Sequence, residues 1–160
     1  MKTKTLSIKY EIYGSIDELD PADRELVEAA TEAQKTSYAP YSKFNVGAAI
    51  RLDNGLIIKG SNQENAASPD GLCAERTAMF AASAAYPDNA MVSMAISGGY
   101  GFKMDDTPCT PCGSCRQVMA EYQNKSGVPM SVIMAGKKQT WKFHKVEDIL
   151  PFIFNSLETK

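Results

Sequence analysis

Apolar residues recur along two stretches of the chain at the spacing of one helix face. The first stretch is DELDPADRELVEAATEAQKTSY, residues 17–38, in which Asp20 is suited to cap a helix and Pro21 to begin it. The second is PDGLCAERTAMFAASAA, residues 69–85. Their apolar positions are Leu26, Ala29, Ala30 and Ala33 in the first, and Leu72, Ala78, Met79 and Phe80 in the second. We expect helices over both stretches and a third helix at CGSCRQVMAEYQ, residues 112–123.

Short apolar runs between and after these helices predict strands. NVGAAIRL and LIIKGSN are joined by the turn DNG and predict a hairpin. MVSMAISGG, SVIMAG and QTWKFH predict three more strands, and VEDILPFIF predicts a short terminal helix. The order α β β α β α β β α indicates an α/β fold in which a central five-stranded sheet carries helices on both faces.

The first residues of the chain alternate loosely between polar and apolar, with apolar side chains at Leu6, Ile8, Tyr10 and Ile12. This pattern is compatible with an extra edge strand, a surface arm or a partly ordered tail. We expect residues 1–21 to form an N-terminal extension and residues 22–160 to form one domain.

Composition and charge exclude several classes of protein. The chain has 17 basic and 19 acidic residues and a net charge of −2, without a strong block of either sign. This balance argues against a dedicated nucleic-acid or membrane-surface protein. No apolar run reaches the length of a membrane span, and the start of the chain lacks the apolar core of a secretion signal. We therefore expect a cytoplasmic protein.

The four cysteines lie close to two predicted helix starts. Cys73 opens the second helix, and Cys112 and Cys115 form a C-x2-C pair at the start of the third. Helix N-termini favour thiolate, which is the form that binds metal. Three thiolates leave one position open on a tetrahedral zinc, as in catalytic sites. Cys109 also stands in C-x2-C spacing with Cys112, so the alternative is a closed structural site with Cys109 as fourth ligand.

Glu75 distinguishes these two kinds of zinc site. A structural site does not need a carboxyl group beside a ligand, whereas a hydrolytic site needs one to move the protons of water. Side chains at a helix start lean toward the N-terminus, so Cys73 and Glu75 reach the same space. The C-x-E pair together with the downstream PCxxC therefore favours a hydrolytic zinc site.

CAERTA followed by PCGSCRQV resembles the zinc-dependent cytidine deaminases, the small type that acts on free nucleosides. The resemblance covers about residues 22–155 and includes YAPYSKFNVGAA, the NQEN loop and the LPFIF terminus, but not the first 21 residues. It implies a three-layer α-β-α sandwich around a mixed five-stranded sheet, assembled as a homotetramer. It also implies deamination of cytidine and deoxycytidine to uridine and deoxyuridine, in pyrimidine salvage.

The resemblance also assigns roles to residues. Zn²⁺ would be held by Cys73, Cys112 and Cys115, and Glu75 would pass a proton from the attacking water to N3 of cytosine and then to the leaving amine. Three thiolates on zinc leave a net negative charge, so we expect Arg76 and Arg116, which stand close to the cysteines in sequence, to hydrogen-bond the thiolates and offset that charge. The substrate would contact the Ala74 backbone, the Phe44 ring, and Asn62 and Glu64 at the ribose. Phe154 would reach the site of a neighbouring subunit.

The sequence departs from the family pattern at two places. IFN replaces a more usual Ser-Phe-Gly at the terminus, and Ser68 stands where the family often has an aromatic residue. The first departure weakens the inference about Phe154, and the second concerns substrate access or the subunit boundary. His144 and Trp141 lie outside both zinc motifs, and we expect a surface position and a place on the sheet respectively.

Other functions fit parts of the pattern. A deaminase of the same fold acting on another amino-pyrimidine, such as a blasticidin-type nucleoside, is the main alternative, and the Asn62-x-Glu64 pair favours a ribose. A nucleic-acid editing deaminase would need a basic strand-binding groove. A structural zinc module for protein contacts would use Cys109. A thiol redox protein would need a thioredoxin-like βαβ context, which the sequence lacks.

Overall fold

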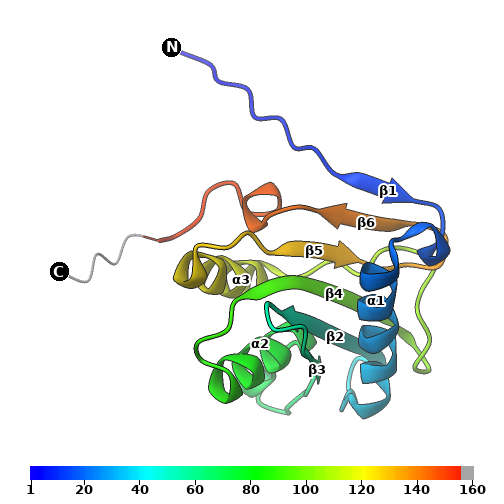
Figure 1. Ribbon diagram of the computed structural model, residues 1–160. Coiled ribbons are helices and arrows are strands. Elements are labelled where there is room, and N and C mark those ends of the chain that lie inside the picture. Colours follow the sequence, from blue (N-terminus) through cyan, green and yellow to red (C-terminus); the bar gives the residue numbers. More distant parts are fainter. Residues whose placement is uncertain (156–160) are drawn as a thin grey trace.

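One mixed sheet of six strands organises the protein, whose structure is a computed structural model that describes residues 1–155 (Figure 1). The strand order is β1-β6-β5-β4-β2-β3. The only parallel pair in this part of the chain is β4–β5, and the other neighbours run antiparallel. The strands are β1 (Glu11–Tyr13), β2 (Phe44–Leu52), β3 (Ile57–Ser61), β4 (Met91–Tyr100), β5 (Ser131–Met134) and β6 (Thr140–Phe143).

Three helices cover the two faces of the sheet, which confirms the predicted three-layer sandwich. Helix α1 (Pro21–Ala33) packs on one face, and α2 (Ala74–Ala85) and α3 (Gly113–Ser126) pack on the other (Figure 1). Asp20 caps α1 as expected, because its side chain accepts a hydrogen bond from the Asp23 amide. No helix within residues 1–155 combines the length and the apolar composition that a membrane crossing requires.

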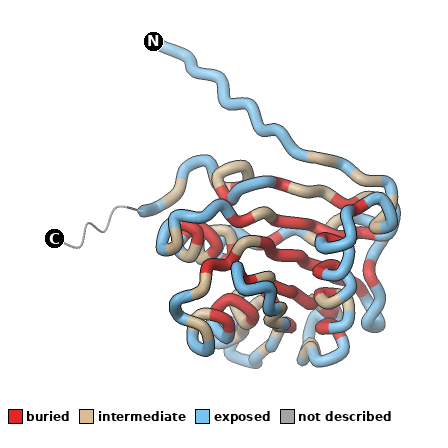
Figure 2. Tube along the Cα trace, in the orientation of Figure 1, coloured by how far each residue is buried: buried red, intermediate tan, exposed pale blue. Residues whose placement is uncertain are grey.

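Each face of the sheet has its own apolar core, and buried residues follow the central strands (Figure 2). On the α1 face, Leu26 and Ala30 pack against Ala95 of β4. On the other face, Met79 of α2 and Met119 of α3 pack against the central strands. Both cores depend on residues that alternate along the strands, so the central strands are buried on both sides.

The structure departs from the sequence-based expectation at both ends of the chain. The sheet has a sixth strand because β1 adds to the edge of β6, so the N-terminal extension does contribute an edge strand. The prediction of a terminal helix over residues 146–154 is wrong, because only Val146–Asp148 form a single 3-10 turn. Pro151 explains the difference, because a proline disfavours helical backbone at the residue before it. Phe80 is also 42% exposed and lies outside the core.

Candidate zinc site and nucleoside cavity

Two helices on the same face of the sheet begin at cysteines. Cys73 is the N-cap of α2 and Cys112 is the N-cap of α3, and neither side chain accepts a capping hydrogen bond from the backbone of its helix. The sulfur atoms of these two cysteines lie 3.8 Å apart. Cys115, one turn into α3, lies with its sulfur 3.5 Å from that of Cys112.

The three sulfur atoms fit a zinc ion. They all lie within 4.8 Å of one another, and sulfurs on a tetrahedral zinc stand about 3.8 Å apart, given Zn–S bonds of about 2.3 Å. A hydrogen bond from Cys115, followed by those from Arg76 and Cys112, lowers the pKa of Cys73 to about 5. The pKa of Cys115 is raised, first because it donates to Cys73 and then because of burial. One sulfur therefore loses its proton readily, and a metal ion displaces the protons of the others.

Cys109 does not belong to this group. Its sulfur lies beside Gly98 of β4, and its side chain packs against the apolar core. Burial raises the pKa of its thiol to about 12. Among the described residues that offer metal ligands, the group holds Cys73, Cys112 and Cys115 without Cys109. The arrangement therefore favours an open site with three protein ligands over a closed one with four.

Glu75 is buried in the first turn of α2, two residues after the first cysteine. Its exposed fraction is only 4%, and this burial raises the pKa of its carboxyl group to about 7. A carboxyl group with such a pKa can both take up and release a proton near neutral pH. Ala74, the first residue of α2, is fully buried next to it.

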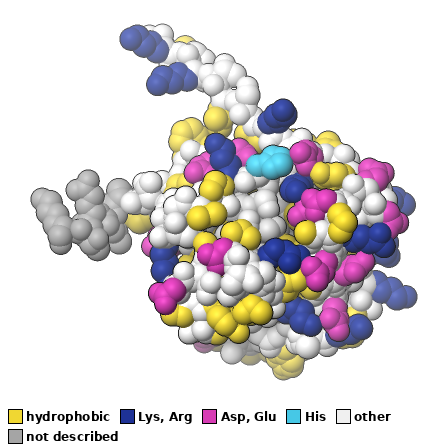
Figure 3. Space-filling model, viewed as in Figure 1, with side chains coloured by type: hydrophobic (Ala, Val, Ile, Leu, Met, Phe, Trp, Pro, Cys, Tyr) yellow, Lys and Arg dark blue, Asp and Glu magenta, His cyan; other side chains and the backbone are white. Residues whose placement is uncertain are grey.

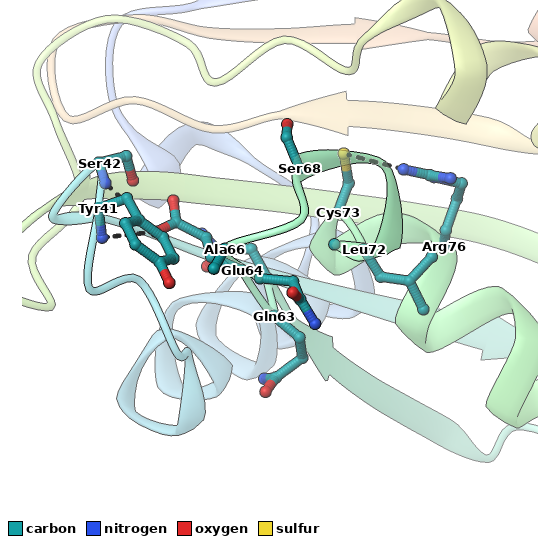
Figure 4. A pocket seen from close by; sticks show the side chains of 12 residues that line it. Tyr41, Ser42, Gln63, Glu64, Ala66, Ser68, Leu72, Cys73 and Arg76 are labelled. Carbon is teal, nitrogen blue, oxygen red and sulfur yellow. Dashed lines mark hydrogen bonds between the residues drawn. The ribbon is translucent and has the colours of Figure 1, made fainter.

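The two arginines near the cysteines behave differently. The Arg76 guanidinium donates to the Cys73 sulfur over 3.7 Å (Figure 4). Arg116 instead donates through Nε to the Pro111 carbonyl and through Nη1 to the Ile149 carbonyl, each at 3.0 Å. The structure therefore contradicts the expected contact between Arg116 and a thiolate among the described residues. Arg116 braces the loop before Cys112 against the C-terminal segment.

A cavity of about 460 Å³ opens beside the first cysteine and the Arg76 side chain (Figure 4). Asn62 and Glu64, both predicted to hold a ribose, line it. The Glu64 carboxylate accepts hydrogen bonds from the amides of Tyr41 and Ser42 through one oxygen. A hydrogen bond from the Ser42 side chain, followed by those from the two amides, lowers the pKa of Glu64.

Asn62 is committed to the neighbouring strand. Its amide oxygen accepts from the Val46 N–H at 2.9 Å, and its amide nitrogen donates to the Phe44 carbonyl at 3.0 Å. Phe44 opens β2, and its ring packs edge-on against Tyr100 and lies close to Gly98. Asn62 therefore fixes the start of β2 and the position of the Phe44 ring.

Phe154 does not reach the cavity of its own chain. Its side chain is 65% exposed, and its backbone is held by Gln117, which donates to the Phe154 carbonyl at 2.7 Å and accepts from its amide. Gln117 follows directly after Arg116 on α3 and was not singled out from the sequence. Tyr41 and Ser42 were also missed, because their amide hydrogen bonds to Glu64 come from backbone N–H groups that any residue carries.

His144 and Trp141 lie where the sequence indicated. His144 is exposed beyond the end of β6 and bonds to Glu11. Trp141 lies within β6 and contacts the ring of Tyr10 edge-on, with ring centres 5.8 Å apart. Neither residue lines the cavity or the sulfur cluster.

Comparison with known proteins gives consistent matches. The family model for the cytidine and deoxycytidylate deaminase zinc-binding region matches residues 20–131. The cytidine deaminase of Halalkalibacterium halodurans is 44% identical over 96 residues, which are 60% of this chain and 68% of that protein. The cytidine deaminase of Sporosarcina psychrophila is 38% identical over 137 residues, covering 81% of this chain and 89% of that one. The crystal structure of cytidine deaminase from Burkholderia pseudomallei superposes with a TM-score of 0.68 at 37% identity, covering 81% of this chain and 97% of that one.

Proposed function

Because the chain belongs to the cytidine and deoxycytidylate deaminase family, we propose that it hydrolyses cytidine and deoxycytidine to uridine and deoxyuridine with release of ammonia. The observation that carries this proposal is the buried Glu75 carboxyl beside an open cluster of three cysteine sulfurs. A structural zinc site does not need a buried carboxyl group for proton transfer, whereas a hydrolytic site does.

The protein binds zinc through its three clustered cysteines. When bound, zinc acts as a Lewis acid that makes water a nucleophile near neutral pH. The positively charged Arg76 guanidinium donates a hydrogen bond to the Cys73 sulfur and so offsets part of the negative charge of three thiolates. Arg116 has a different task, since it holds the Pro111 carbonyl and thereby the backbone that leads into Cys112.

Glu75 moves the protons of the reaction. It accepts a proton from the attacking water and delivers it to N3 of the cytosine ring while the water oxygen bonds to C4. The hydroxyl proton on C4 then passes through Glu75 to the exocyclic amine, which leaves as ammonia, and C4 keeps the oxygen. A pKa of about 7 suits a group that must both accept and donate a proton in one turnover.

The cavity supplies the nucleoside site. Glu64 keeps one carboxylate oxygen for a ribose hydroxyl while the other is held by the Tyr41 and Ser42 amides. Asn62 completes the ribose site with the remaining amide hydrogen and lone pair while it fixes β2. The Phe44 ring, next to Gly98, stacks against the base. The Ala74 backbone contacts the pyrimidine edge.

The active assembly is a homotetramer in which Phe154 reaches a neighbouring site. Support comes from the exposed Phe154 side chain and from its firm anchoring by Gln117 on the helix that carries Cys115. A cluster of free thiols is stable in a reducing compartment, which supports a cytoplasmic enzyme of pyrimidine salvage.

The test is the loss of cytosine absorbance when purified protein is mixed with cytidine or deoxycytidine. Glu75→Gln should lower kcat by about 10²–10⁴-fold because it removes the proton-transfer group, and it should retain its zinc. Glu121→Gln, an identical change on the exposed side of α3, is the matched control and should behave as wild type. A zinc-loaded wild type that leaves both nucleosides unchanged would refute the proposal and direct the assay to other amino-pyrimidine nucleosides.

A further inference from the structure

The outer edge of β1 has no partner in the part of the chain that the structure describes. β1 is the last strand of the sheet and pairs with β6 on one side only. Residues 1–10 continue from it as an extended arm of solvent-exposed residues that points away from the body (Figures 1 and 3). An unpaired edge of this kind is a template for pairing with another strand.

The strand direction continues from β1 into the arm. The Tyr10 ring stacks on Phe143 of β6 with ring centres 5.0 Å apart, at an interplanar angle of 16°. Ile12 lies opposite Trp141 in the register of β1 with β6. Since alternate residues share a face, Ile8, Tyr10 and Ile12 form one apolar row. They are 46%, 41% and 55% exposed, so this row is largely uncovered.

The sequence of this edge is self-complementary in the antiparallel direction. Ile8-Lys9-Tyr10-Glu11-Ile12 reads the same from both ends, except that Lys and Glu exchange places. Two copies related by a two-fold axis at Tyr10 pair Lys9 of each copy with Glu11 of the other. The same axis pairs Ile8 with Ile12 and Tyr10 with Tyr10. Opposite charges and apolar residues in directly opposed positions both stabilise a strand pair.

Neighbouring registers lack this complementarity. A slip by one residue moves the apolar row of one copy to the polar face of the other. Moving the axis to Lys9 places two lysines opposite each other, and moving it to Glu11 places two carboxylates opposite each other, both of which are unfavourable. Pairing farther out along the arm brings together only basic charges, because residues 1–10 hold Lys2, Lys4 and Lys9 and no acidic residue.

We propose that the edge formed by residues 8–12 pairs antiparallel with the same residues of a second copy of this chain, about a two-fold axis at Tyr10. The contact is isologous and joins two six-stranded sheets into one. Glu11 already bonds to Tyr13 and His144, and a carboxylate has lone pairs for a further donor. This surface includes no residue of the cavity or of the sulfur cluster, so the inference does not depend on the proposed function.

A charge exchange tests the register. Sedimentation velocity of the full chain over a dilution series measures the association of wild type, Lys9→Glu, Glu11→Lys and the double variant. Each single variant places like charges opposite each other twice per dimer, so association through this edge should weaken by about tenfold or more. The double variant restores two opposite-charge pairs and should regain most of the association. Lys4→Glu makes the same charge change outside the paired residues and should sediment as wild type.

A cysteine at the two-fold axis tests the same geometry independently of charge. Tyr10→Cys places two thiols directly opposite each other, and mild oxidation should give a disulfide-linked dimer. Leu6→Cys is the control, because Leu6 is more exposed, at 58%, but faces Gly14 of the other copy in this register. Zinc content and far-ultraviolet circular dichroism check that each variant is folded. Equal cross-linking of the two cysteine variants, or association that Lys9→Glu and Glu11→Lys leave unchanged, would overturn the proposal.

Discussion

Three side chains at the start of α2 have different environments, and each environment suits a different role in the site. Cys73 is the half-buried N-cap, Glu75 turns inward and is buried, and Arg76 folds back to the Cys73 sulfur. The motif CAERTA predicted that Cys73 and Glu75 reach the same space, because side chains within one helical turn have fixed relative directions. The burial of Glu75 was not predicted, since it depends on what covers the helix start.

Arg76→Gln should weaken zinc binding, because it removes the positive charge beside the Cys73 sulfur while keeping a hydrogen-bond donor. Changes to groups that contact metal ligands typically cost about 10–100-fold in metal affinity. Transfer of zinc to a competing chromophoric chelator measures this directly. Arg24→Gln removes an equal charge from the surface of α1 and is the control. Identical zinc affinities for both variants would show that Arg76 has no role in holding the metal.

At the scale of elements, the site depends on how closely α2 packs on β3. A Cβ atom at Gly60 of β3 would lie 2.4 Å from the Ala78 nitrogen and 2.7 Å from the Ala74 carbonyl oxygen. Both are backbone atoms, so a side chain at position 60 forces the helix itself to move. The predicted strand and helix were confirmed, but this contact joins elements that the sequence pattern treats separately.

Gly60→Ala should therefore shift the start of α2 together with Cys73 and Glu75. We expect the free energy of unfolding to fall by about 1–3 kcal/mol, as for other overpacked positions, and the zinc-bound fraction to fall with it. Urea denaturation and metal analysis measure the two effects. Gly113→Ala, at a glycine where a Cβ meets no atom within 4 Å, should not lower stability. Equal stability of wild type and Gly60→Ala would mean that α2 adapts without strain.

The stability that the Tyr13–Glu11 hydrogen bond of β1 contributes should be lost at alkaline pH. The hydrogen bond from Tyr13 to Glu11, followed by burial, raises the pKa of Tyr13 from 10.0 to about 12. Below pH 10 the phenol is neutral in both the folded and unfolded states, so its stabilising contribution is complete. Between pH 10 and 12 the unfolded chain ionises first, and the contribution is lost.

The free energy of unfolding of wild type should thus fall more steeply between pH 10 and 12 than that of Tyr13→Phe. Urea denaturation at several pH values gives the two slopes. Tyr100→Phe, at a tyrosine that is 66% exposed, provides the reference for a general loss of a phenol. If the free energy of unfolding falls equally steeply with pH in wild type and Tyr13→Phe, Tyr13 does not cause the alkaline loss of stability.

At the scale of the whole molecule, the sulfur cluster brings together two helices that are distant in sequence. Cys73 and Cys112 come from the starts of α2 and α3, and both helices pack on the same face of the sheet (Figure 1). A metal that binds the folded but not the unfolded chain stabilises the fold. The zinc site should therefore contribute to global stability as well as to chemistry.

Removal of zinc by a chelator should lower Tm by about 10 °C, which corresponds to roughly 4 kcal/mol of binding free energy. Differential scanning calorimetry with and without zinc measures the change. Cys112→Ser should abolish the zinc-dependent part of Tm, whereas Cys109→Ser should keep it. If Cys109→Ser also loses the zinc-dependent increase in Tm, the result would support a zinc site with four cysteine ligands.

The sequence by itself determined the local features: helix starts, strands, the C-x-E and C-x2-C patterns, and hence the ligand types and the family resemblance. These follow from spacing within single elements, which fixes side-chain direction. Tertiary structure decided everything that joins distant segments. It brought Cys73 within 3.8 Å of Cys112, buried Glu75, excluded Cys109, turned Arg116 from the thiolates to two carbonyls and added β1 to the edge of β6. The physical reason is that burial, pKa and unpaired edges are set by neighbours in space, which spacing along the chain does not specify.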